Sequence, residues 1–205
     1  MEDVLEVYQR PYDPMHPVVC IDEMNRQLVE EVRIPCKPSQ PEKVDSEYVR
    51  KGVMDVFMIA EPLAGKRDTL VTQTRTAIDF AYVLQHTSDA LYPQAEKIVL
   101  VTDNLNTHTP ASLYKAFAPE EARRLAERFE WHYTPKHGSW LDMAEIELSI
   151  LSRQALAKPK PDAESFSQAV HSWASIRNAE CRKIHWQFTA ADARIKLAKL
   201  YPTIV

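Results

Sequence analysis

The stretch Ile98-Val-Leu-Val-Thr-Asp103-Asn-Leu-Asn-Thr-His108 passes from a short apolar run directly into a carboxylate and two amides. Five apolar or β-branched residues bounded by turn-forming residues predict a buried strand, so we expect Asp103 at the carboxyl end of that strand. Ligands bind beyond this end of the strands in open α/β sheets. An ordinary loop is the alternative, because Asp and Asn also begin turns by bonding to their own backbone.

A second apolar run, Pro17-Val-Val-Cys-Ile-Asp22-Glu23, also ends in carboxylates. We interpret it as a strand that ends at Asp22 and Glu23, with a hairpin turn at residues 24–26. A rough alternation of apolar residues over positions 28–34 then predicts an antiparallel partner strand. Residues 35–41 hold three prolines and a serine, which indicates an irregular loop.

The rest of the chain up to residue 157 predicts strands and helices in alternation. Strands are expected at residues 53–60, near 69–71 and at 129–133, and helices from Thr76, on either side of Pro119 and after Trp140. Thr76 and Asp79 have the spacing of a capping box, and so do Ser139 and Asp142. Glu145 is then expected in the second turn of the last helix. This order predicts an α/β fold with a mixed sheet flanked by helices.

The motif Lys158-Pro-Lys-Pro161 is a linker by composition. Beyond it we expect an amphipathic helix, an extended segment and a final helix, indicated by Phe166, Val170 and Trp173, by Ile184, Trp186 and Phe188, and by the capping pair Thr189 and Asp192. We therefore divide the chain into a lead-in helix and loop (residues 1–16), a main domain (17–157) and a short, basic, helical C-terminal extension (158–205).

Composition excludes several classes of protein. With 45% hydrophobic and 26% charged residues, the 205-residue chain resembles an ordinary soluble globular protein. Three glycines are too few for a Gly-rich dinucleotide loop or a P-loop. Cys20, Cys36 and Cys181 are far apart, so we interpret them as core thiols rather than as disulfides or zinc ligands. No membrane span or signal peptide is evident, which predicts a cytoplasmic protein.

The net charge of -4 hides an uneven distribution. Residues 150–205 carry nine Lys or Arg and four Asp or Glu, whereas residues 1–149 carry sixteen and twenty-five. An acidic body with a basic tail lacks the broad basic surface of an autonomous DNA-binding domain. If nucleic acid is the substrate, much of the affinity must come from elsewhere.

Three acids, Asp22, Asp103 and Glu145, are far apart in sequence, but neighbouring strands and a facing helix can bring them together. Carboxylate oxygens with few supporting histidines suit Mg²⁺ or Mn²⁺ rather than zinc. Two such ions can activate the attacking oxygen and stabilise the leaving oxygen of an in-line phosphoryl transfer. Each acid on its own also has an interpretation without a functional role. Asp22 is then a solvated acid at the end of a strand, and Glu145 is an exposed residue of a helix.

Three segments resemble the signature of the DDE-type transposases of bacterial insertion sequences, in the branch related to mariner elements: Asp103-Asn-Leu-Asn-Thr-His108, Tyr133-Thr-Pro-Lys-His-Gly-Ser-Trp-Leu141 and Met143-Ala-Glu-Ile-Glu-Leu148. Phe188-Thr-Ala-Ala-Asp-Ala-Arg-Ile-Lys-Leu197 resembles the C-terminal end of that family. The resemblance implies a ribonuclease-H-like catalytic domain over residues 17–157. It also implies two divalent ions, Mg²⁺ or Mn²⁺, and cleavage and joining of DNA at transposon ends.

The resemblance makes Asp22 the first catalytic acid, Asp103 the second and Glu145 the third, and the same three residues become the metal ligands. Glu147 is a nearby rival, but the spacing of the family motif favours Glu145, and Glu147 would face away from Asp142 and Glu145 along the helix. We expect Glu147 to be a solvated or salt-bridged surface acid. Asp142 departs from the family, which usually has Asn there, and we expect it mainly to cap the helix.

His108 and His137 flank the proposed site. The resemblance places both near the metals, and His137 with Lys136 is suited to contact a DNA phosphate. A lone histidine in a polar loop is more often structural, which is the alternative. We predict DNA contacts at His108, Lys136 and His137, and we expect Trp140 in the core rather than as a base-stacking surface.

Family members commonly carry N-terminal helix-turn-helix domains that recognise the ends of the element, and this sequence begins just before the catalytic region. We therefore expect a split or truncated copy that binds transposon-end and target DNA as a homodimer or with a partner chain carrying such domains. A catalytically inactive relic, acting as a protein-interaction or regulatory module, is the alternative function. A zinc hydrolase is a distant third, because no His-x-x-x-His or paired Cys motif is present.

Overall fold

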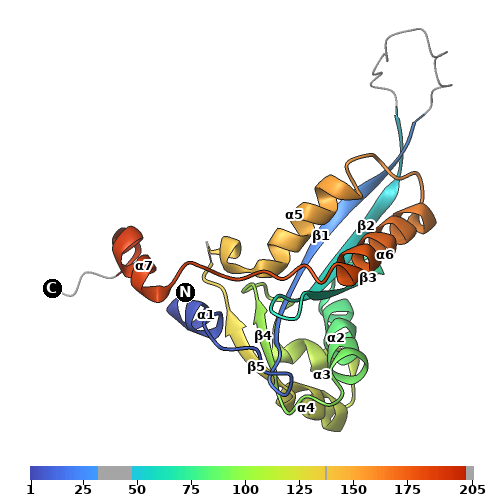
Figure 1. Cartoon of the computed structure of the whole chain (residues 1–205). Helices are drawn as coiled ribbons and strands as arrows, with labels where there is room; N and C mark the ends of the chain where they lie inside the picture. The colour runs from blue at the N-terminus through green and yellow to red at the C-terminus, as the bar shows by residue number, and fades with distance from the viewer. Residues whose placement is uncertain (32–47, 137, 202–205) are drawn as a thin grey trace.

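A five-stranded mixed sheet forms the centre of the computed structural model, which describes residues 1–31, 48–136 and 138–201 (Figure 1). The strands are β1 (Val18–Glu31), β2 (Tyr48–Glu61), β3 (Lys66–Thr72), β4 (Ile98–Thr102) and β5 (Phe129–Tyr133), in the order β3-β2-β1-β4-β5. The pairs β1–β2 and β2–β3 are antiparallel, whereas β4 is parallel to both β1 and β5. The predicted mixed sheet is confirmed.

Helices cover both faces of this sheet (Figure 1). Consecutive side chains of a strand point to opposite faces, so Cys20 of β1 joins one apolar core, while Val19 and Ile21 join the other. The first core is completed by α1 (Glu2–Val7), α5 (Met143–Gln154), α6 (Ala163–Ala179) and α7 (Ala190–Lys196). The second is completed by α2 (Ala77–His86), α3 (Leu113–Ala116) and α4 (Pro119–Glu127). Short turns add a π-helix, Thr87–Leu91, and 3-10 helices at Pro110–Ser112, Ser139–Leu141 and Ala198–Leu200.

Strand β1 is longer than predicted, because residues 24–26 do not form a turn. They pair with β2, for example Asn25 with Asp55. The polar sequence from Asp22 to Gln27 is typical of a loop, but pairing with a long partner strand overrides this local preference. The predicted hairpin turn is therefore wrong, and residues 28–31 belong to β1 itself. Residues 32–41, with the predicted proline-rich loop and Cys36, lie outside the described residues.

Two of the three predicted capping pairs are confirmed. Thr76 and Asp79 form the capping box of α2, and Thr189 and Asp192 form that of α7. In each box the threonine hydroxyl accepts a hydrogen bond from the aspartate backbone, and the aspartate carboxylate accepts one in return. Pro119 begins α4, as expected for a proline in the first turn of a helix.

The predicted capping box of Ser139 and Asp142 is wrong. Asp142 is itself the N-cap of α5, and its Oδ1 accepts a hydrogen bond from the backbone N–H of Ala144 at 2.8 Å. Ser139 belongs to a separate 3-10 turn that precedes the helix. Consequently Glu145 lies in the first turn of α5 rather than the second.

Helix α6 packs against β3 and α5 with Phe166, Val170 and Trp173 buried, as the amphipathic pattern predicted. The backbone of the preceding linker also contacts the sheet, because Val29 N–H donates to the carbonyl of Lys160 at 2.9 Å. The division of the chain at residue 157 stays a prediction.

A buried ion-pair cluster joins three of these elements. Glu147 of α5 lies 3.2 Å from Arg67 of β3 and 2.8 Å from Arg177 of α6. Glu147 is salt-bridged, as predicted, but it is not a surface acid, because its side chain is 0% exposed. Its carboxylate faces two arginines that lie far away in the sequence.

Two further predictions about burial are wrong. Trp140 is 44% exposed, and its ring stacks on Trp186 with centroids 6.1 Å apart. Cys20 is buried as expected, but Cys181 is exposed. In the part of the chain that the structure describes, no helix is both long and apolar enough to cross a membrane.

Candidate active site

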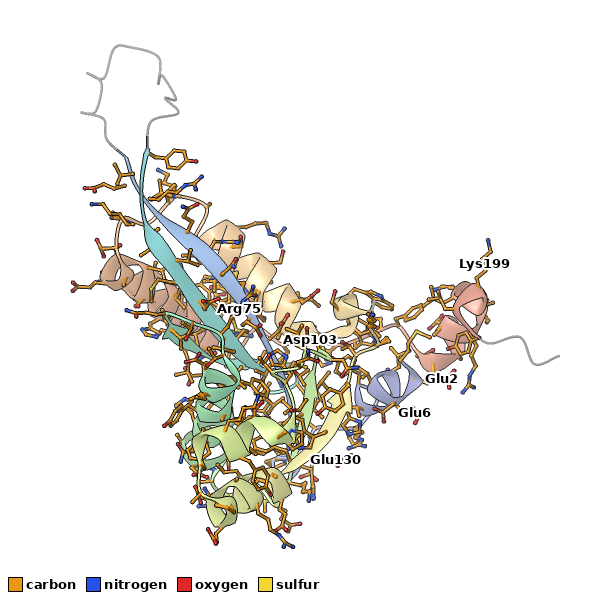
Figure 2. All side chains as sticks on the ribbon, turned by 180° about the vertical axis from the view of Figure 1, so that it is seen from behind. Glu2, Glu6, Arg75, Asp103, Glu130 and Lys199 are labelled. Carbon is orange, nitrogen blue, oxygen red and sulfur yellow. The ribbon has the colours of Figure 1, made fainter. Side chains whose placement is uncertain are left out.

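Asp22 and Asp103 follow the last paired residues of two parallel strands. Ile21 of β1 pairs with Thr102 of β4, and each is followed directly by one of the acids. Asp103 lies at the carboxyl end of β4, as predicted (Figure 2). Asp22 lies inside β1, opposite Met58 of β2. The parallel pairing of β1 with β4, rather than the end of β1, therefore brings these carboxylates together.

Helix α5 contributes two more carboxylates and completes what we call the acid cluster: Asp22, Asp103, Asp142 and Glu145. Burial and the charges of Glu23, Asp103 and Glu145 raise the pKa of Asp22 to about 7. The same proximity acts on Asp142, whose pKa is raised well above its usual range by burial and then by the charge of Asp22. The structure thus brings the three predicted acids together and adds Asp142 to them.

Asp142 is fully buried in this cluster. Its Oδ1 makes the capping bond of α5, so the predicted cap is present. Among the described residues, its Oδ2 has no hydrogen-bond donor. A buried carboxyl oxygen without a donor is costly for the ionised form, which agrees with the raised pKa.

His108 lies between Asp103 and Glu23. Its Nδ1 is 2.5 Å from Asp103 Oδ1, and its Nε2 is 2.9 Å from Glu23 Oε2. Burial alone would lower the pKa of His108, but the hydrogen bonds and charges of these two acids outweigh burial and raise the pKa to about 9. A buried cation therefore adjoins the acid cluster.

Glu23 was not among the residues predicted for the site. Its side chain is only 3% exposed, and the Nη1 atom of the half-exposed Arg75 lies 3.9 Å from Glu23 Oε1. The one signal in the sequence is that Glu23 follows Asp22 directly. Its partner His108 lies far away in the chain, so no local pattern reveals the contact.

The predicted DNA-contacting residues differ in their positions. His108 is buried within ion-pair distance of two acids, whereas Lys136 is exposed in the loop after β5. His137 lies outside the described residues. DNA contacts of these three residues stay predictions.

The donor set of the acid cluster fits a hard divalent cation. Carboxylate oxygens are the ligands that Mg²⁺ and Mn²⁺ prefer, and Asp142 Oδ2 is a buried oxygen without a donor among the described residues. Burial, and then the nearby charges of Glu23, Asp103 and Glu145, raise the pKa of Asp22, and a bound cation would offset both effects. In residues 1–31, 48–136 and 138–201, no three His, Cys, Asp or Glu side chains already surround one ion position. Side chains of the cluster would have to turn to hold an ion.

Comparisons with known proteins identify the family and the fold of this chain. The model of the DDE superfamily endonucleases matches residues 17–167. A crystal structure of the Mos1 strand transfer complex is similar with a TM-score of 0.51 and 17% identity, over 87% of this chain and 57% of that one. A crystal structure of the Mos1 mariner paired end complex with Mn is similar with a TM-score of 0.53 and 17% identity, over 87% of this chain and 54% of that one. No curated protein matches by sequence.

A more distant structure is similar as well. The simian T-cell lymphotropic virus intasome in complex with PP2A regulatory subunit B56 gamma gives a TM-score of 0.50 and 11% identity, over 79% of this chain and 49% of that one. The chain thus spans about half the length of the chains it matches. At these identities the structural matches establish the fold, and they confirm the expected ribonuclease-H-like sheet. Because the family model covers most of the sequence, this chain belongs to the DDE superfamily endonucleases.

Proposed function

We propose that this chain is the catalytic domain of a DNA transposase that cuts DNA at the ends of an insertion sequence and joins those ends to a target. Asp22, Asp103 and Glu145 are its catalytic acids and metal ligands. The observation that carries the proposal is the gathering of these three acids from β1, the end of β4 and α5 in a DDE endonuclease. The Mos1 complexes are named for strand transfer and for paired ends with Mn, which supports the same class of reaction.

Asp22, Asp103 and Glu145 would hold Mg²⁺ or Mn²⁺, as two ions. When bound, such ions activate the attacking oxygen and stabilise the leaving oxygen of an in-line phosphoryl transfer. Asp22 lies on a central strand and Glu145 on the first turn of α5, which limits the ordering that these two acids need on binding. Burial and nearby acids raise the pKa of Asp22 to about 7, so a cation competes with a proton there and should bind more tightly as the pH rises.

DNA binding by this acidic chain needs help from outside the acid cluster. The net charge of the chain is -4, and sequence-specific affinity normally depends on many phosphate contacts from Lys and Arg. Lys136 is exposed and can contribute one such contact. We propose that a second copy, or a partner chain with helix-turn-helix domains, supplies most of the affinity for transposon ends.

Plasmid nicking tests the proposal directly. Purified chain is incubated with supercoiled DNA and Mg²⁺ or Mn²⁺, alongside Asp103→Asn and the control Asp89→Asn, which alters an exposed acid paired with Arg124. We expect nicking by the wild type and by the control. We expect a loss of about 100-fold or more in Asp103→Asn, because a metal ligand supports several kcal/mol of charge stabilisation.

An inactive family member that acts through protein contacts is the second candidate. Two observations favour it: no three described acidic or histidine side chains already surround one ion position, and the buried Asp142 stands where the family usually has Asn. No nicking by the wild type, with metal-induced stabilisation equal in wild type and Asp103→Asn, would favour this candidate over the transposase.

A further inference from the structure

Glu23 is a buried acid that lies next to Asp22 in sequence but on the other face of the sheet. Side chains of β1 alternate, so Cys20 belongs to the core beneath α5, and Ile21 belongs to the core beneath α2. Asp22 follows the first pattern and reaches the acid cluster, whereas Glu23 follows the second. Glu23 therefore cannot take the place of Asp22 in the cluster without a change of strand register.

His108 links Glu23 to Asp103, because each of its two ring nitrogens lies close to one of these acids. Its Nε2 lies 2.9 Å from Glu23 Oε2, and its Nδ1 lies 2.5 Å from Asp103 Oδ1. The ring also packs on Phe80, with centroids 4.3 Å apart, and Nδ1 lies 3.2 Å from the hydroxyl of Thr102. The side chain of His108 is only 1% exposed and has contacts on its edges and on one face, which restrict rotation of the imidazole.

The Asp103 carboxylate depends more than that of Asp22 on a side chain that holds it in place. It follows the last residue of β4, and its side chain is 26% exposed. Apart from His108, the hydrogen bond to Asp103 Oδ1 within the described residues is a long one from the backbone N–H of Leu105, at 3.2 Å. A carboxylate at a strand end with one weak local bond can rotate, and rotation would move its oxygens away from the cluster.

We propose that Glu23 is a positioning residue: acting through His108, it fixes the orientation of the Asp103 carboxylate for the acid cluster. This inference rests on the proposed function, in which Asp103 is a metal ligand. His108 is the group that contacts the ligand Asp103, and partners of this kind typically contribute 10-fold to 100-fold to metal affinity or activity without touching the metal. Glu23 acts one contact further away, through its ion pair with His108. Glu23 would thus join β1 and the end of β4 on the face away from the reaction.

The test compares Glu23→Gln and Glu23→Leu with the wild type. Glutamine keeps the shape and one acceptor oxygen, whereas leucine removes the acceptor but keeps the buried volume. Glu30→Gln is the matched control, because Glu30 lies on the same strand and pairs with Lys51 at the surface. Three quantities are measured: Mn²⁺ affinity by calorimetry, kcat and KM for plasmid nicking, and the free energy of unfolding in EDTA.

We expect Glu23→Leu to weaken Mn²⁺ binding and to lower kcat by about 10-fold to 100-fold, with little change in KM for DNA. Glu23→Gln should have a Mn²⁺ affinity and a kcat between those of Glu23→Leu and the wild type, and Glu30→Gln should behave as the wild type. A purely structural role gives a different result: the free energy of unfolding falls, while the folded variants bind Mn²⁺ and turn over normally. That result would overturn the inference.

A double variant tests whether Glu23 acts through His108. If it does, adding Glu23→Leu to His108→Asn should cause little further loss of Mn²⁺ affinity, because His108→Asn has already removed the side chain that links Glu23 to Asp103. Independent, additive losses would contradict the inference.

Asp103→Asn distinguishes failure of the positioning role from failure of the proposed function. If it is inactive while Glu23→Leu is fully active, only the positioning role fails; if it matches the wild type in Mn²⁺ binding and nicking, the proposed function fails and the role of Glu23 fails with it.

Discussion

Asp142 combines two properties that conflict, because it caps α5 and also lies fully buried among like charges. Its pKa is raised well above the usual range by burial and by Asp22. In the metal-free protein, the buried Asp142 carboxyl therefore makes folding less favourable as the pH rises above the pKa that this group has in the unfolded chain. Asn at this position would keep the capping oxygen and remove the charge. We predict that Asp142→Asn raises the free energy of unfolding in EDTA at pH 8 by on the order of 1–3 kcal/mol.

Urea unfolding of the wild type and Asp142→Asn at pH 8 checks this prediction. Asp162→Asn is the control, because Asp162 caps α6 in the same way but is exposed and has a lowered pKa. The control should show no gain in stability. If Asp142 mainly caps the helix, Asp142→Asn should leave the Mg²⁺ dependence of nicking as it is. A changed Mg²⁺ dependence with unchanged stability would show that the charge of Asp142 acts mainly on the metal site, and that capping is not its main role.

At the scale of elements, Glu147 holds α5 against β3 and α6. Its carboxylate accepts hydrogen bonds from Arg177 at 2.8 and 2.9 Å and from Arg67 at 3.2 Å. Removing the charge leaves two poorly solvated guanidinium groups without a counterion. We predict that Glu147→Gln lowers the free energy of unfolding by about 3–5 kcal/mol, the usual cost of breaking a buried ion pair.

Denaturant unfolding followed by tryptophan fluorescence measures this effect. Glu180→Gln removes an acid from an exposed pair with Arg182 and should cost less than about 1 kcal/mol. Similar small losses in both variants would show that the buried pair contributes little. The folded fraction of Glu147→Gln should still nick DNA, whereas Glu145→Gln should not. The opposite pattern would assign the third acid to Glu147.

The sequence allowed good prediction of elements whose signals are local. The apolar run of β4 ends in Asp103, and the capping pair Thr76 and Asp79 begins α2, because a few adjacent residues decide each. Contacts between distant residues were not accessible. The long pairing of β1 with β2 overrides a polar stretch that resembles a turn, and the arginines that bury Glu147 come from other elements.

The candidate site was predictable for a different reason. The expected strands and helix singled out Asp22, Asp103 and Glu145, and the resemblance to a family gave them their roles. The parallel register of β1 and β4 explains why the first two are neighbours. Glu23 could not be predicted, because its importance depends on which face of β1 it occupies and on the path of the loop that carries His108. Alternation along the strand gives the face only once the strand is known to continue through Asp22.

For the molecule as a whole, the acid cluster and its histidine make stability depend on pH in one direction. The pKa of Asp22 rises from an ordinary value of 3.8 to about 7 through burial and nearby acids, so the folded protein binds more protons than the unfolded chain between these values. The pKa of His108 rises from 6.5 to about 9, so its stabilising charge is fully present below about pH 6.5 and is lost as the pH rises through 9. Both groups therefore make the metal-free protein less stable as the pH rises.

We predict that the Tm in EDTA falls between about pH 5 and pH 9, by about 2–4 °C for each kcal/mol lost. Mg²⁺ or Mn²⁺ should raise the Tm at about pH 8 but not at about pH 5, because cations bind the ionised carboxylates and compete with protons. Calorimetric scans of the wild type and Asp22→Asn check both effects. The variant should show a flatter pH dependence and a smaller response to metal, since it lacks the carboxyl that titrates near pH 7. The predicted fall in Tm requires carboxyl groups whose pKa is raised in the folded protein. A Tm in EDTA that rises from about pH 5 to pH 9 would therefore contradict the buried acid cluster.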